Sequence, residues 1–257
     1  MVLEQILLAT IIVSVISLVG VFLAPTNKKD DLWLVLIISF AAGAMLAGAF
    51  FDVLPEALDT LPADQVLTTT LLSILMFFIL EKFVYWHHNH HHIHDQHKKG
   101  EVKIKAVGYL NLIGDGMHNF FDGVAIAASF MTDFHLGVIT TIAIVAHEIP
   151  QEIGDFGLLI YSGFSRSKAL FFNLLSALIS IIGAVVFFYF AQTIKDLQAL
   201  GLAFTAGTFI YMSCTDLIPE LFHNHEKKDA TLKKDLLQTI ALFIGVIVIY
   251  IVVKILK

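Results

Sequence analysis

The stretches NLIGDGMHNFFD (residues 111–122) and HEIPQEIGD (residues 147–155) are polar sequences, each inside an apolar run long enough to cross a membrane. Ionisable side chains inside such a run are energetically costly and rare, so they mark a functional site by default. We therefore expect the rest of the chain to be organised around these two stretches.

The first stretch places its polar residues on one face of a helix. At about 100° per residue, Asn111, Asp115, His118 and Asp122 fall within roughly 60° of one another, with Asn119 beside them. The imidazole of His118 and the carboxylate of Asp122 stand at positions i and i+4, a spacing that suits first-row divalent metals. The sequence thus predicts one metal-binding face on this helix.

The second stretch also gathers its polar residues on one side. They share an arc of roughly 140°, and they are His147, Glu148, Gln151, Glu152 and Asp155. If the two helices face each other, imidazoles, carboxylates and carboxamides converge on one small volume inside a bilayer. This arrangement predicts a binding site for a divalent cation.

The composition indicates an integral membrane protein. Of the 257 residues, 57% are hydrophobic and only 15% are charged, and the mean hydropathy is +0.81. Soluble domains carry about 25% charged residues. We expect a single transmembrane domain over residues 1–257 and no soluble domain.

Eight apolar segments are expected to be transmembrane helices. Basic residues in the connectors between them accumulate on one side, which predicts that this side is cytoplasmic and that both termini lie outside. The segments are approximately 3–24, 32–51, 66–86, 107–130, 136–161, 169–191, 197–217 and 236–256. The basic residues on the predicted cytoplasmic side are Lys28, Lys29, Lys82, Lys98, Lys99, Lys103, Lys105, Arg166, Lys168, Lys227, Lys228, Lys233 and Lys234, whereas the other side has Lys195, Lys254 and Lys257.

An internal repeat relates the second segment to the seventh. FAAGAMLAGAFFDVLPE (residues 40–56) and FTAGTFIYMSCTDLIPE (residues 204–220) align without a gap and share Phe, Ala-Gly and the final Asp-x-x-Pro-Glu. The two segments run in opposite directions in the predicted topology. Inverted repeats around a midplane site are typical of secondary transporters. We therefore expect spans 1–3 and 6–8 to form an inverted repeat around the polar site on spans 4 and 5; the alternative is chance similarity of two helices rich in small residues.

HEIPQE resembles the start of the zinc-protease motif HExxH, which leaves open an intramembrane metalloenzyme. Position 151 is Gln, however, so the second imidazole of that motif is absent, and Pro150 would distort the helix. A hydrogen-bonded polar network without metal is a further alternative. Adjacent carboxylates repel unless cations or protons neutralise them, which favours the metal site.

HNFFDGVAIAASF (residues 118–130) and HEIPQEIGDFGLLI (residues 147–160) resemble the fourth and fifth transmembrane helices of the ZIP family of divalent-metal transporters, which carry HNxxDGxAI and HExPHExGD. The likeness extends over the whole chain. It implies a one- or two-metal site, with Glu152 as a weaker candidate next to the ligands. Those implied ligands are His118, Asn119, Asp122, His147, Glu148 and Gln151. Gln151 departs from the family pattern, which has a second His there; Gln binds first-row metals more weakly.

Five accessory positions have possible roles beside this site. Met45 would lend a thioether or only pack in the helix bundle, and Asp52 would attract cations at the entrance or lie on a solvated loop edge. Ser180 would contact the site or pack helices. Asp115 belongs to the polar face of the first stretch, and Asp155 would stand along the cytoplasmic exit.

A His-rich connector follows the third segment. We expect residues 87–106 to form a cytoplasmic loop that binds metal by its composition, although a merely polar connector is the alternative. Its imidazoles belong to His87, His88, His90, His91, His92, His94 and His97.

Together these features predict transport of divalent cations, zinc first, into the cytoplasm. The resemblance implies alternating access and a homodimer. Iron(II), manganese or cadmium can use the same ligands, so preference among these metals stays open. There is no GxxxxGK[ST] motif for ATP. We expect no enzymatic activity, no catalytic cofactor and no nucleic-acid partner, and we expect a multi-pass location in a plasma membrane, with a prokaryotic inner membrane favoured.

Overall fold

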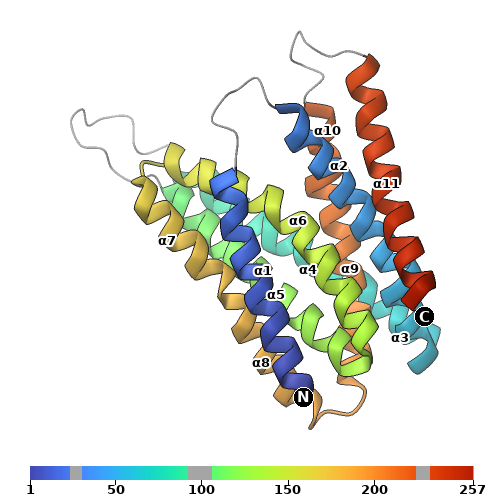
Figure 1. Cartoon of the computed structure of the whole chain (residues 1–257). Helices are drawn as coiled ribbons and strands as arrows, with labels where there is room; N and C mark the ends of the chain where they lie inside the picture. The colour runs from blue at the N-terminus through green and yellow to red at the C-terminus, as the bar shows by residue number, and fades with distance from the viewer. Residues whose placement is uncertain (24–30, 92–105, 224–231, 257) are drawn as a thin grey trace.

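The computed structural model describes residues 1–23, 31–91, 106–223 and 232–256, which form helices without any strand (Figure 1). The prediction of an all-helical fold is confirmed. In chain order, the α-helices are α1 (Val2–Leu23), α2 (Asp31–Gly48), α3 (Leu54–Thr60), α4 (Ala63–His91), α5 (Ala106–Thr132), α6 (Phe134–Tyr161), α7 (Arg166–Ala177), α8 (Ile179–Ala191), α9 (Leu197–Met212), α10 (Ile218–His223) and α11 (Leu232–Leu256). Two π-helices, η1 (Ala49–Val53) and η2 (Ser213–Leu217), join α2 to α3 and α9 to α10.

Each predicted apolar segment coincides with helical structure, the sixth with the two helices α7 and α8. Five helical stretches among the described residues are long and apolar enough to cross a membrane. They are Val35–Thr60, Ala63–Lys82, Arg166–Ala191, Leu197–Leu217 and Leu232–Ile255. Helices α5 and α6 have 27 and 28 residues and carry the polar stretches. Both chain ends lie at one end of the bundle, opposite the end where α4 stops and α5 begins (Figure 1).

The two π-helices occupy the same place in the internal repeat. Adding 164 to the bounds of η1 gives the bounds of η2, and the same offset aligns residues 40–56 with 204–220. Pro55 and Pro219 each follow two residues after the π-helix. A proline has no N–H to donate and its ring clashes with the carbonyl four residues earlier, so a locally wider helical turn accommodates it. The repeat is thus accompanied by a shared backbone irregularity.

Helices α5 and α8 pack backbone against backbone at two glycines. A Cβ on Gly123 would lie 1.8 Å from the carbonyl oxygen of Ser180, and one on Gly183 would lie 2.0 Å from that of Phe120. Small residues permit this approach where helices associate inside a membrane. The helix that carries His118 is therefore held closely to α8.

A second pair of helices, α2 and α11, shows the same kind of packing. A Cβ on Gly43 would lie 2.0 Å from the carbonyl oxygen of Leu242, and one on Gly245 would lie 2.2 Å from that of Phe40. Backbone approaches of this kind tolerate no side chain, which explains why glycine occupies these positions.

The sixth apolar segment is interrupted between α7 and α8. Ser14 of α1 and Ser180 each donate a hydroxyl to the carbonyl of Ala177, at 3.0 and 2.7 Å. The interruption leaves a backbone acceptor without a regular helical partner, and the two hydroxyls satisfy it. Ser14 thereby ties α1 to this break.

Helices α5 and α6 form a hairpin whose turn is a single residue, Asp133. Its carboxylate caps α6 by accepting the backbone N–H groups of His135 at 2.8 Å and Leu136 at 3.3 Å. Ser129 and Thr140 share a hydrogen bond of 2.9 Å between the two helices close to this turn. Capping at the N-terminus of α6 satisfies donors that the helix cannot pair itself.

Candidate metal centre

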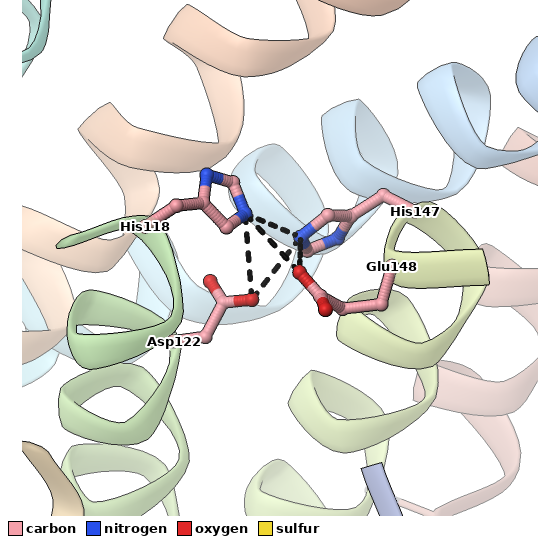
Figure 2. A group of neighbouring side chains, drawn as sticks. All are labelled: His118, Asp122, His147 and Glu148. Atoms are coloured by element: carbon pink, nitrogen blue, oxygen red, sulfur yellow. Dashed lines mark hydrogen bonds and ion pairs between the residues drawn. The ribbon is translucent and has the colours of Figure 1, made fainter. Parts of the chain in front are cut away.

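Four side chains from the middle of α5 and α6 point toward one another (Figure 2). We call His118, Asp122, His147 and Glu148 the four-ligand centre. One ligand atom from each residue lies within 4.8 Å of the other three. The Nε2 atoms of His118 and His147 are 3.2 Å apart. The facing of the two stretches that the helical periodicity predicts is therefore present in the structure.

Four further distances within the centre are compatible with tetrahedral coordination. His118 Nε2 lies 3.6 Å from Asp122 Oδ2 and 3.4 Å from Glu148 Oε1. His147 Nε2 lies 3.2 Å and 3.7 Å from the same two oxygens. Four ligands at zinc–nitrogen and zinc–oxygen distances of about 2.0–2.2 Å stand about 3.3–3.6 Å apart in a tetrahedron. The four-ligand centre can therefore hold a zinc-sized ion with little rearrangement.

A backbone hydrogen bond orients His147 for metal binding. Its Nδ1 lies 3.1 Å from the carbonyl oxygen of Ala143 one turn earlier. A carbonyl only accepts, so the ring proton is on Nδ1 and the lone pair of Nε2 faces the centre. Such a bond from the second nitrogen of a ligating His is the usual way of setting its tautomer.

The centre is buried except on one side. The side chains of Asp122, His147 and Glu148 are at most 1% exposed, whereas that of His118 is 11% exposed. His118 lines a cavity of about 630 Å³. On α5 the lining ends at His118 and on α6 it begins at Gln151, so the cavity approaches from the end of the bundle where α6 finishes. Beyond the centre, apolar side chains such as Met45, Ile144 and Phe209 are fully buried.

Two further predicted ligands have different environments. Asn119 is buried and donates its side-chain amide to Asp115, to the backbone oxygen at 3.1 Å and to Oδ1 at 2.9 Å. Gln151 is partly exposed and lines the cavity next to His118.

The other predicted acids surround the centre. Glu152 is 1% exposed and does not join the four-ligand centre. Asp115 and Asp155 line the cavity, and Asp155 Oδ1 accepts a hydrogen bond of 3.0 Å from Asn111. Asp155 therefore lies on the cavity side of the centre.

The three accessory residues outside α5 and α6 lie in packed surroundings. Met45 is fully buried in an apolar cluster of the core, and the Ser180 hydroxyl donates to the carbonyl of Ala177 at the break between α7 and α8. Asp52 is buried within η1. None of the three is among the residues that line the cavity.

The His-rich segment is only partly described. Helix α4 continues through His91, so the predicted start of the loop at residue 87 falls inside this helix. His92, His94 and His97 lie outside the described residues.

Several polar residues that line the cavity or contact the polar stretches were not predicted from the sequence. Glu81 of α4 accepts a hydrogen bond from the Tyr211 hydroxyl, and Asp216 of η2 faces the same cavity. Asn173 of α7 is buried and donates to the backbone oxygen of Glu152 at 3.1 Å. An Asn or Asp inside an apolar segment is the signal that would have found Asn173 and Asp216.

Comparison with known proteins identifies the family. The ZIP zinc transporter family matches residues 5–99 and 85–253 of the chain, and the chain belongs to this family. Zinc transporter zipt-7.1 of Caenorhabditis briggsae is 39% identical over 165 residues, which cover 61% of this chain and 42% of that protein.

Two more relatives illustrate the range of matches. Zinc transporter zipt-7.2 of Caenorhabditis elegans is 44% identical over 128 residues, 48% of this chain and 28% of the relative. Zinc transporter ZIP10 of Homo sapiens is 35% identical over 149 residues, 56% of this chain and 18% of the relative. The chain thus spans less than half the length of these relatives.

Proposed function

We propose that this protein carries divalent cations, zinc first, across a membrane into the cytoplasm. The observation that carries this proposal is the four-ligand centre, in which two imidazoles and two carboxylates converge halfway along two helices of a membrane bundle. Mixed nitrogen and oxygen ligands in a tetrahedron suit zinc. Family membership and the names of the zinc-transporting relatives support the same function.

The proposed topology has eight spans. Besides the five apolar stretches, we count three more helices as spans. They are α1, in which Val2–Ile16 forms a shorter apolar helix, and the long helices α5 and α6. At 1.5 Å per residue, α5 and α6 are each about 40 Å long, more than the hydrocarbon thickness of about 30 Å. The matching positions of η1 and η2 support the inverted repeat. In this topology residues 1–257 form one transporter unit in a plasma membrane, with both termini outside.

The cavity supports alternating access. It reaches His118 from the end of the bundle that we assign to the cytoplasm, while buried apolar side chains close the opposite side. This arrangement corresponds to an inward-facing state. A cation bound at the four-ligand centre would leave through the cavity past Asp155 and Asp216. The His-rich segment, which begins in the last turns of α4, would meet it on the cytoplasmic side. The proposed assembly is a homodimer.

The rival function is that of a membrane metalloenzyme, whose metal stays bound and activates water. Here two imidazoles and two carboxylates offer a full set of four ligands, which leaves no open position for water in a tetrahedral zinc site. Closed sites of this kind do not favour hydrolysis. Transport is therefore the better proposal.

Flux measurements test the proposal. The purified chain is reconstituted in sealed vesicles, and zinc, iron(II), manganese and cadmium are offered in competition. We expect zinc to enter the lumen at a rate well above that of protein-free vesicles and to compete best. Tight zinc binding without any flux would contradict transport.

A further inference from the structure

The acids Asp52 and Asp216 occupy equivalent positions in the internal repeat, but their surroundings differ. The offset of 164 residues that relates the two π-helices also relates Asp52 to Asp216. Asp52 is fully buried, whereas Asp216 is exposed and lines the cavity. The next residue of each π-helix repeats this difference, because Val53 is 1% exposed and Leu217 lines the cavity. Two segments of related sequence and backbone shape therefore have opposite exposure.

The position of α6 accounts for this difference. Helix α6, which carries His147 and Glu148, packs together with α9 against η1, and η1 leads into α3 near the two chain ends (Figure 1). On the other side of the four-ligand centre, the cavity lies between α6 and η2, since Asp155 of α6 and Asp216 of η2 both line it. Helix α6 is thus closed against one π-helix of the repeat and separated by the cavity from the other.

A smaller pocket at the end of the bundle with the chain ends shows a second correspondence. This outer pocket has a volume of about 510 Å³ and is lined by the end of α3, the end of α5, the α8–α9 connection and the start of α9. Leu202 lines it, and the repeat partner of Leu202 is Ile38, which lines the cavity on the other side of the centre. Asp52 is not among the residues that line the outer pocket. The pocket therefore marks the outer end of a path that is closed at η1.

We propose that Asp52 is the acid that receives cations from outside in a second, outward-facing state, in which α6 leaves η1 and Asp52 gains the exposure that Asp216 has here. In an inverted repeat, the conformation of one half indicates that of the other half in the opposite state. Subtracting 164 from the cavity residues Tyr211, Met212, Asp216 and Leu217 gives the lining of the outer cavity as Ala47, Gly48, Asp52 and Val53.

Asp52 is the acid of this set, so it supplies the negative charge that raises the local concentration of cations. All four residues of the set are buried in the present state. The part of Asp52 in uptake rests on the proposed function, whereas the existence of the outward-facing state does not.

Cysteine accessibility tests the outward-facing state without measuring transport. The full chain is purified in lipid nanodiscs with Cys214→Ser, which removes the single native cysteine, and with either Ala47→Cys or Val53→Cys. A charged thiol reagent that does not enter lipid is then added. A minor state of this kind is populated at about 0.1–10%, so both cysteines should react at about that fraction of the rate of a fully exposed cysteine.

Ala44→Cys is the matched control, because Ala44 is a fully buried residue of α2 whose repeat partner, Thr208, does not line the cavity. It should remain unreactive. Equal rates for all three variants, whether low or high, would overturn the outward-facing state. Size-exclusion elution verifies that each variant is folded, and the use of two test positions keeps the experiment decisive if one of them misfolds.

Zinc uptake tests the part played by Asp52. In Asp52→Asn the half-saturating zinc concentration should rise by a few-fold to about tenfold with little change in the maximal rate, because Asp52 acts before the cation reaches the four-ligand centre. Glu4→Gln, at an exposed acid of α1, is the control and should change neither quantity. An unchanged half-saturating concentration in Asp52→Asn would overturn its role. Absence of zinc flux in wild-type vesicles, with Ala47→Cys and Val53→Cys reacting as expected, would reject the proposed function and leave the outward-facing state standing.

Discussion

The α5–α8 pair and the α2–α11 pair are built by the same packing device but differ in what they carry. In both pairs two glycines bring one helix backbone against the other, at Gly123 and Gly183 in the first and at Gly43 and Gly245 in the second. Of these four helices, α5 is the one that contributes side chains to the four-ligand centre, namely His118 and Asp122. Helix α2 instead leads into η1, the π-helix of the internal repeat. Close packing alone therefore does not mark the functional helices; the polar face does.

The difference suggests a division of labour that fits the proposed alternating access. The α5–α8 pair and α6 contain the four-ligand centre, whereas α2, α9 and α11 contact them with largely apolar surfaces. If the two pairs move as units, the metal travels with the first pair. Variants that affect one pair and leave the other intact can test this division.

The largest effect is expected from loss of an imidazole in the α5–α6 part. His118→Ala or His147→Ala should abolish most zinc uptake, because each removes one of the two nitrogen ligands. Uptake is measured as initial rates in vesicles at matched protein content. His135→Ala is the control, since His135 also belongs to α6 but is about half exposed, at 48%. Normal uptake by either variant would contradict the assignment of that histidine as a metal ligand.

A smaller effect should separate the two glycine-packed pairs. Gly183→Ala and Gly245→Ala each force a methyl group into a backbone contact, and overpacking of this kind destabilises by about 1–3 kcal/mol or more. Both variants should unfold at lower temperature, but only Gly183→Ala should also weaken zinc binding, because it displaces α5. Gly157→Ala is the control, as a Cβ there meets nothing within 4 Å. Equal weakening of zinc binding in both variants would mean that the pairs are not independent units.

A moderate loss is expected at Asp216, the cavity residue of η2. Asp216→Asn removes a negative charge from the cavity and should lower uptake by a few-fold to about tenfold, since charged clefts raise the local concentration of their ions. The effect should shrink at high salt. Asp64→Asn, at an exposed acid in the first turn of α4, should have little effect. If the two variants behave alike over a range of salt concentrations, Asp216 does not contribute to the path.

The smallest effects should come from Gln151. Gln151→Ala should harm uptake less than His147→Ala, because Gln151 lines the cavity next to His118 and a carboxamide binds first-row metals more weakly than an imidazole. Gln151→His would add an imidazole beside the centre and should tighten zinc binding and slow release. Zinc affinity and uptake rate are measured together. A loss in Gln151→Ala as severe as that in His147→Ala would make Gln151 an essential ligand.

Much of the architecture follows from simple sequence patterns. Apolar blocks predict the helical runs to within a few residues at most ends, and a rotation of 100° per residue predicts that His118 and Asp122 share a face. The same arithmetic places Glu152 at the edge of the polar arc of α6 that is farthest from His147. In the structure the Asn173 amide donates to the backbone oxygen of Glu152. Periodicity predicts the face of a helix well because that face depends only on the backbone.

What the sequence could not predict depends on side-chain conformation and on neighbouring helices. Asn119 is adjacent to a ligand in the chain, yet its amide turns back to Asp115. Ser180 lies midway along an apolar segment, but its hydroxyl donates to the carbonyl of Ala177 at the break between α7 and α8. No Gly or Pro at this position indicates the break in the sequence. The only sequence feature that points to the π-helices is a proline after each, Pro55 and Pro219, and it is informative only when the two repeats are compared. Local pattern does not determine such contacts, because several rotamers are available to each side chain.

The single-residue turn at Asp133 supplies an internal reference for acid titrations of the metal centre. Slight burial opposes the charged form of this carboxyl, but hydrogen bonds from the backbone of Leu136 and His135, together with the His135 imidazole, hold the pKa of Asp133 below its ordinary value of 3.8. The stabilising contribution of a carboxyl with a lowered pKa is present above its unfolded pKa and is lost only as the pH falls through the folded value. Above about pH 5 the carboxylate that caps α6 therefore keeps its charge. A change in zinc binding above that pH does not arise from loss of this cap at the turn that joins α5 to α6.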